Sequence, residues 1–115
     1  MTSPTSISRT ITNRRVRPVP PGQVLVELYL RPRGVSIARF AEAAGVTRKH
    51  MSAIVNERAG ITAETAARIA LVLGTTAQYW LNLQNAVDLY DANARLQRGV
   101  RRPHPLAAFK DDHPE

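Results

Sequence analysis

Most of the side chains that could do chemistry lie in one short segment. An α-helix over residues 48–55 would place a set of polar groups on its outer side or at its ends: Thr47, Arg48, Lys49, His50, Ser52 and Asn56. Arginine and lysine can donate to guanine O6 and N7 or to phosphate, and His50 and Ser52 can donate or accept at base edges. Thr47 would stand at the helix N-terminus, where backbone N–H groups point toward a phosphate. These residue types favour contact with DNA.

No other cluster in the sequence fits a catalytic or metal centre. Four potential metal ligands lie in a proline-broken tail with nothing to orient them: His104, Asp111, Asp112 and His113. Glu42 and Glu57 could be named as a carboxylate pair, but the sequence has no nucleophile motif, phosphate-binding loop or HExxH pattern. The chain also has no cysteine for a thiolate site. We therefore expect no enzymatic activity, no metal and no cofactor.

The net charge also points to a polyanionic partner. The 115 residues include 16 lysines and arginines against 9 acidic residues, which gives a net charge of +7. Residues 21–97 contribute only +2, from eight basic and six acidic side chains. More than half of the excess lies in residues 1–20, which contain no acidic residue and four arginines: Arg9, Arg14, Arg15 and Arg17.

The length and the hydropathy pattern indicate one small domain that does not enter a membrane. A chain of 115 residues suffices for one ordinary domain. It has no apolar run of about 18 residues that could span a bilayer. Its first 20 residues lack the apolar stretch of a secretory signal. We therefore expect a cytoplasmic protein, of bacterial or phage type.

Proline and glycine mark the elements that must position these side chains. Seven of the eight prolines lie outside residues 22–102, and five glycines follow apolar segments, where helix ends favour positive φ: Gly34, Gly45, Gly60, Gly74 and Gly99. The pattern predicts an all-α fold of five helices. The first covers about 22–31, the second follows Ser36 as N-cap and stops at Gly45, and the third follows Thr47 as N-cap. The fourth opens with Thr62 and ends before Gly74, and the last opens at Thr75 or Thr76 and frays near residues 95–99. Thr75 and Gln78 fit a capping box for the last helix. No alternation of apolar and polar residues indicates a strand.

The second and third helices have the spacing of a helix-turn-helix. Ala41 is small where two helices would cross closely, and Gly45 can adopt the turn conformation. Val46, Met51 and Ile54 would anchor the third helix to the core, which leaves its polar side chains facing outward. Apolar residues at helical spacing predict the rest of the core: Val24, Leu25 and Leu28; Ile37, Phe40, Ala41 and Ala44; Val55; Ala66, Ile69, Ala70 and Leu73; Trp80, Leu83, Val87 and Tyr90.

The last helix has more apolar surface than its core stripe needs. Four residues widen this surface beyond the Trp80 stripe: Tyr79, Leu81, Ala86 and Leu89. A helix this apolar favours two contacts, one with its own core and one with a second copy of the chain. The alternative is a single deep groove between the other helices.

We divide the chain into a flexible basic arm (1–19), a helix-turn-helix domain for DNA binding and dimerisation (20–97) and a flexible C-terminal tail (98–115). The arm is rich in Ser, Thr, Arg and Pro and cannot bury a core. Its arginines could lie along phosphates or enter a minor groove. The alternative is a disordered arm that only aids solubility.

Residues 20–94 resemble the HigA-type antitoxins, which belong to the phage-repressor-like (XRE) helix-turn-helix proteins. The resemblance rests on Pro20-Pro21-Gly22, Gly45-Val46-Thr47-Arg48, Ile54-Val55-Asn56, Gly60-Ile61-Thr62, Ala66-Ala67-Arg68-Ile69-Ala70, Leu73-Gly74-Thr75 and, most diagnostic, Trp80-Leu81-Asn82-Leu83-Gln84. Relatives usually begin with His-Pro-Gly, and many have Gln where this chain has Ile37.

The resemblance implies a five-helix domain that dimerises, binds a palindromic operator and represses its own operon. It also implies a RelE-like (HigB-type) toxin as partner, an mRNA-cleaving ribonuclease that the antitoxin blocks. The base-reading positions of the group map to Arg48, Lys49, His50 and Ser52, and its backbone-contacting positions map to Thr47 and Asn56. We expect the toxin to bind away from these residues, on the first helix and its flank. The alternative is a free-standing XRE-type repressor without a toxin.

Overall fold

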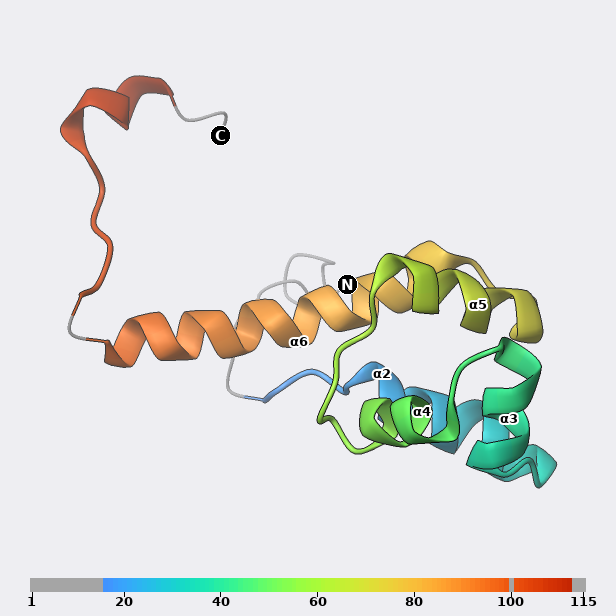
Figure 1. Cartoon of the computed structure of the whole chain (residues 1–115). Helices are drawn as coiled ribbons and strands as arrows, with labels where there is room; N and C mark the ends of the chain where they lie inside the picture. The colour runs from blue at the N-terminus through green and yellow to red at the C-terminus, as the bar shows by residue number, and fades with distance from the viewer. Residues whose placement is uncertain (1–15, 100, 113–115) are drawn as a thin grey trace, which may run out of the picture.

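The computed structural model describes residues 16–99 and 101–112, and every element in these ranges is helical (Figure 1). The first of the five helical segments between residues 21 and 98 runs without a break through three elements: α2 (Pro21–Val24), the π-helical η1 (Leu25–Leu30) and the 3-10 helical η2 (Arg31–Arg33). The other four are α3 (Ile37–Ala44), α4 (Arg48–Val55), α5 (Ala63–Leu73) and α6 (Ala77–Arg98). The predicted all-α, five-helix fold is confirmed.

Hydroxyl side chains begin four of these helices. Each accepts a hydrogen bond from the backbone N–H three residues on, which satisfies one of the free donors of the first turn: Ser36, Thr47, Thr62 and Thr76. The predicted capping box between Thr75 and Gln78 is wrong. Thr75 Oγ1 instead accepts from Trp80 Nε1 at 2.8 Å, and Gln78 Nε2 donates to Asn82. The Thr75 hydroxyl is therefore bonded to the buried indole of Trp80 and does not cap the helix.

Helix ends use positive φ at three of the five predicted glycines, namely Gly34, Gly45 and Gly74. The expectation is wrong for Gly60 and Gly99. After α4 the left-handed residue is Glu57, with φ 61°. The N–H groups of Glu57 and Arg58 bond back to the last turn of α4, at 3.1 and 2.7 Å. This pattern closes the helix end without a glycine.

The first helical segment differs from its predicted face. Leu25 is 1% exposed as expected, but Leu28 is 60% exposed and Leu30 is 3% exposed. The reason is the π-helical turn of η1, whose hydrogen bonds join residues five apart rather than four. The wider turn brings Leu30 rather than Leu28 back to the core side.

Trp80 forms the centre of the core. Its side chain is fully buried, and its ring lies 5.6 Å from that of Tyr29 and 5.1 Å from that of Tyr79. Side chains from every other helical segment pack with it: Val24, Leu25, Leu30, Phe40, Ala41, Ala44, Met51, Ile54, Ile61, Ala66, Ile69 and Ala70. Val87 is buried about two turns further along α6, whereas Leu83 and Tyr90 are only half-buried.

Helix α6 is longer than the body of the domain. Its first half packs against α5, and its C-terminal half extends beyond the other helices (Figure 1). After it, residues 101–109 are all exposed, and the chain forms a 3-10 helix, η3 (Ala107–Asp112), which the sequence pattern did not predict. No helix within the described ranges is long and apolar enough to cross a membrane.

Candidate nucleic-acid interface

The inner side of α4 is fixed by the core, and this orients its outer side. Met51 is fully buried and Ile54 is 2% exposed, and both contact the same cluster as Phe40 and Ala41 of α3. The turn between the two helices has Gly45 at φ 72°, as its position in the sequence predicts. Each of these anchors is where the helix-turn-helix spacing requires it.

All six predicted DNA-contacting residues lie on or beside α4. Thr47, Arg48, Lys49 and Asn56 are exposed, and His50 and Ser52 are half-buried. Thr47 Oγ1 accepts from the His50 N–H at 3.0 Å, so this hydroxyl serves as the helix cap. Asn56 Nδ2 donates to the Ser52 carbonyl at 2.9 Å and lies 3.3 Å from Ser52 Oγ. Within the described part of the chain, the charged groups of Arg48 and Lys49 have no hydrogen bond or ion pair.

The start of α2 presses directly on the end of α4. A Cβ atom added to Gly22 would lie 2.4 Å from the Ile54 carbonyl oxygen and 2.8 Å from Val55 Cα. Only glycine therefore allows this approach, which explains the glycine of the Pro20-Pro21-Gly22 stretch. On the other side of the helix-turn-helix, Arg68 Nη1 donates to the Ala44 carbonyl at 3.2 Å and so ties the end of α3 to α5.

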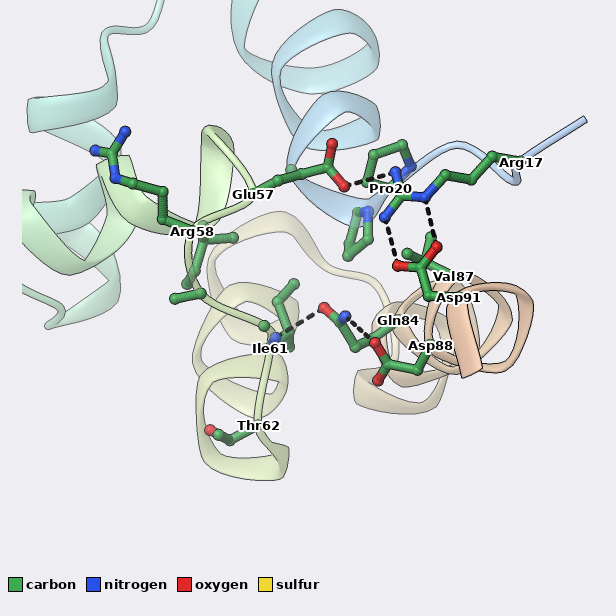
Figure 2. A pocket seen from close by; sticks show the side chains of 15 residues that line it. Arg17, Pro20, Glu57, Arg58, Ile61, Thr62, Gln84, Val87, Asp88 and Asp91 are labelled. Atoms are coloured by element: carbon green, nitrogen blue, oxygen red, sulfur yellow. Dashed lines mark hydrogen bonds and ion pairs between the residues drawn. The ribbon is translucent and has the colours of Figure 1, made fainter. Parts of the chain in front are cut away.

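Arg17 joins two elements that are far apart in the sequence. Its Nη1 donates to Glu57 at 2.8 Å, and its Nε and Nη2 donate to the two oxygens of Asp91 at 2.9 Å each (Figure 2). These hydrogen bonds from Arg17 hold the pKa of Asp91 below its ordinary value. The hydrogen bonds that Arg17 donates to Asp91, and next those to Glu57, hold the pKa of Arg17 above its ordinary value. The sequence pattern placed Arg17 in the basic arm and gave no sign of these partners. Arg9, Arg14, Arg15 and His113 lie outside the described residues.

The most diagnostic block of the family pattern holds the fold together. Trp80 fills the core, and Gln84 Oε1 accepts from the backbone N–H of Ile61 at 2.8 Å. Gln84 Nε2 donates to Asp88 at 3.0 Å (Figure 2). The Gly60-Ile61-Thr62 stretch and the Trp80–Gln84 block therefore occur together because one binds the other.

The four residues predicted for dimerisation differ in exposure. Leu89 is 62% exposed and Tyr79 37%, and Ala86 is also exposed. Leu81 is half-buried, and it packs against the domain's own core. Tyr79, Ala86 and Leu89 thus offer exposed apolar surface on α6, whereas part of the Leu81 side chain is buried inside the domain.

The fold and the exposed polar side of α4 define a helix-turn-helix protein. A family model described as "Helix-turn-helix" matches residues 26–80, which run from η1 to Trp80. Antitoxin HigA-1 of Vibrio cholerae is 40% identical over 90 residues, which cover 78% of this chain and 85% of the relative. The chain belongs to the HigA-type antitoxin family. An uncharacterised HTH-type transcriptional regulator of Escherichia coli K12, YbaQ, is 39% identical over 81% of this chain and 84% of the relative.

Solved structures of relatives include complexes with DNA. Pseudomonas aeruginosa antitoxin HigA with the higBA promoter has a TM-score of 0.71 and 34% identity, covering 78% of this chain and 99% of that one. Antitoxin GraA in complex with its operator has a TM-score of 0.65 and 36% identity, covering 78% and 95%. These relatives are named as antitoxins or regulators and not as enzymes.

Proposed function

We propose that this chain is an antitoxin that represses its own operon. In this proposal it binds a palindromic operator as a dimer and neutralises a RelE-like (HigB-type) ribonuclease toxin. The observation that carries the DNA half is the orientation of α4, whose Met51 and Ile54 are buried while Arg48 and Lys49 are exposed. Relatives that were solved with promoter or operator DNA support it.

In the complex, α4 lies in the major groove as the recognition helix. Arg48 and Lys49 contact guanine edges or phosphate from its first turn, and His50 and Ser52 contact base edges further along. The backbone N–H groups after Thr47 face a phosphate, and Asn56 contacts the DNA backbone. Two copies paired through α6 place their recognition helices in successive major grooves, about 34 Å apart.

Operator binding by a double variant tests the assignment of α4. We expect R48A/K49A to lose at least about 30-fold in affinity for the promoter DNA upstream of its own gene, because the two side chains would make two base contacts of about 1–3 kcal/mol each. The matched control is R101A/R102A, which removes the same charge from exposed residues beyond α6. Fluorescence anisotropy measures both. Equal affinities for R48A/K49A and the control contradict the assignment.

Sedimentation measures whether the chain dimerises through the α6 surface formed by Tyr79, Leu81, Ala86 and Leu89. Leu89→Glu is the sharpest variant, because its side chain is 62% exposed and the change leaves the core intact. We expect a dimeric wild type and a monomeric variant. Leu71→Glu is the control, since Leu71 is 86% exposed on α5. A monomeric wild type, or equal dimerisation of both variants, contradicts the proposal.

Toxin binding is assigned to the first helical segment, on the side away from α4. Leu28 supports this assignment, because the π-helical turn leaves this leucine 60% exposed. Co-expression with the product of the adjacent gene tests it: a short basic protein should co-purify with wild type and Leu71→Glu, and not with Leu28→Glu. The alternative, a free-standing repressor, is favoured by the relative YbaQ, which is named only as a regulator. Operator binding without any co-purifying neighbour supports that alternative.

A further inference from the structure

We propose that Arg17 is a positioning residue for DNA binding: it braces the end of the recognition helix against α6 and does not itself contact DNA. This inference rests on the proposed operator binding through α4. It also changes the interpretation of the basic arm, because it assigns one of the four N-terminal arginines a partner inside the protein.

The geometry of Arg17 is that of a bridge. All three guanidinium nitrogens donate to carboxylates, two of them to Asp91 in a bidentate pair and the third to Glu57, at 2.8–2.9 Å (Figure 2). Bidentate arginine–carboxylate pairs fix orientation as well as distance. The side chains of all three residues are between 37% and 42% exposed, so the bridge lies at the surface but is partly shielded from water.

Glu57 connects the Arg17 bridge to the end of α4. It is the second residue after α4, it has φ 61°, and its N–H bonds to the Ile54 carbonyl. A non-glycine residue in this conformation persists only where its surroundings hold it. The Glu57 backbone therefore has a fixed relation to the last turn of the recognition helix, and its carboxylate connects that backbone to Arg17.

Asp91 connects the Arg17 bridge to α6. It lies two residues after Leu89, on the helix that is proposed to form the dimer. A cavity of about 390 Å³ separates the two elements, with Ile54 and Glu57 on the α4 side and Val87 and Asp91 on the α6 side. Arg17 lines this cavity and spans it, joining Glu57 on the α4 side to Asp91 on the α6 side. It thereby sets how α4 is held relative to the dimer helix, and hence the separation of the two recognition helices.

Two measurements on Arg17→Ala test the brace. In the free protein, amide hydrogen exchange of Glu57 and Arg58 should be about fivefold faster, as expected for the loss of a partly exposed ion pair. With DNA, affinity for the natural operator should fall about fivefold. Affinity for an operator with one base pair inserted at its centre should stay unchanged. The control is Arg31→Ala, which removes a 2.7 Å pair with Glu27 inside the first helical segment and should alter neither measurement.

A double variant of the two carboxylates distinguishes a positioning role of Arg17 from a direct contact between Arg17 and DNA. In E57A/D91A both acceptors are gone, so adding Arg17→Ala should have no further effect on operator affinity. If Arg17 contacts a phosphate, its removal lowers affinity for both spacings equally, reduces the salt slope by about 0.9 and still acts in that background. Those results overturn the proposal, as does unchanged exchange at Glu57 and Arg58. If wild type binds no operator, the proposed function fails, and the exchange measurement still tests the brace.

Discussion

Replacing Gly22 with alanine perturbs the closest approach between α2 and the recognition helix. The new Cβ would lie 2.4 Å from the Ile54 carbonyl oxygen and 2.8 Å from Val55 Cα. Ordinary contacts of this kind are about 3.5 Å, so the backbone of α4 or α2 must move by roughly 1 Å. Overpacking of this size costs about 1–3 kcal/mol. The higher helix propensity of alanine offsets up to about 1 kcal/mol of it.

We therefore expect Gly22→Ala to lower the free energy of unfolding by about 1–2 kcal/mol, measured by urea denaturation. In a thermal scan each kcal/mol should lower Tm by about 4–8 °C. Because the displaced atoms belong to the last turn of α4, the variant should also bind the operator more weakly at temperatures where it is fully folded.

Gly74→Ala is the matched control for Gly22→Ala. Gly74 has φ 77°, and an added Cβ would meet nothing within 4 Å. Its replacement should cost about 1–2 kcal/mol from backbone strain alone and leave operator affinity unchanged. The reasoning is refuted if Gly22→Ala is as stable as wild type and binds the operator equally well, because the two helices would then not be in contact at this point.

Two further predictions concern hydrogen bonds between distant segments. Gln84→Ala should destabilise the domain by about 1–3 kcal/mol, because the backbone N–H of the buried Ile61 loses its acceptor; Gln78→Ala, which removes an exposed bond within α6, should cost less in the same urea titration. Asp91 has a folded-state pKa below its ordinary value because of Arg17, so its contribution to stability is present at neutral pH and lost as the pH falls below about 4. The free energy of unfolding of Asp91→Asn should therefore fall less between pH 5 and pH 3 than that of the wild type. An equal fall in both proteins would contradict this prediction.

Local sequence signals predicted the helices well where the structure is made by local hydrogen bonds. Ser36, Thr47 and Thr62 cap the helices that follow them, and Gly45 and Gly74 end helices with positive φ. Each of these interactions joins residues at most a few positions apart, so the pattern contains all the information that is needed. The same holds for the polar face of α4, because a helical period and two buried anchors suffice to orient it.

Predictions failed where a second local interaction competed with the expected one. Thr75 looks like a helix cap, but the indole of Trp80 takes its hydroxyl, and Thr76 caps α6 instead. Leu28 has helical spacing from Leu25, but a π-helical turn exposes it. Neither competitor can be identified from residue spacing alone.

The sequence by itself determined the class of fold, the caps that begin α3, α4 and α5 and the polar face of α4, because these depend on periodicity and on groups that bond within one turn. Only the tertiary structure decided what holds that face in place. Gly22 meets the end of α4 more than thirty residues away. Arg17 finds carboxylates 40 and 74 residues further along the chain. An exposed arginine has the same local pattern whether it faces DNA or a carboxylate, and only the packing of α4 and α6 brings Glu57 and Asp91 within its reach.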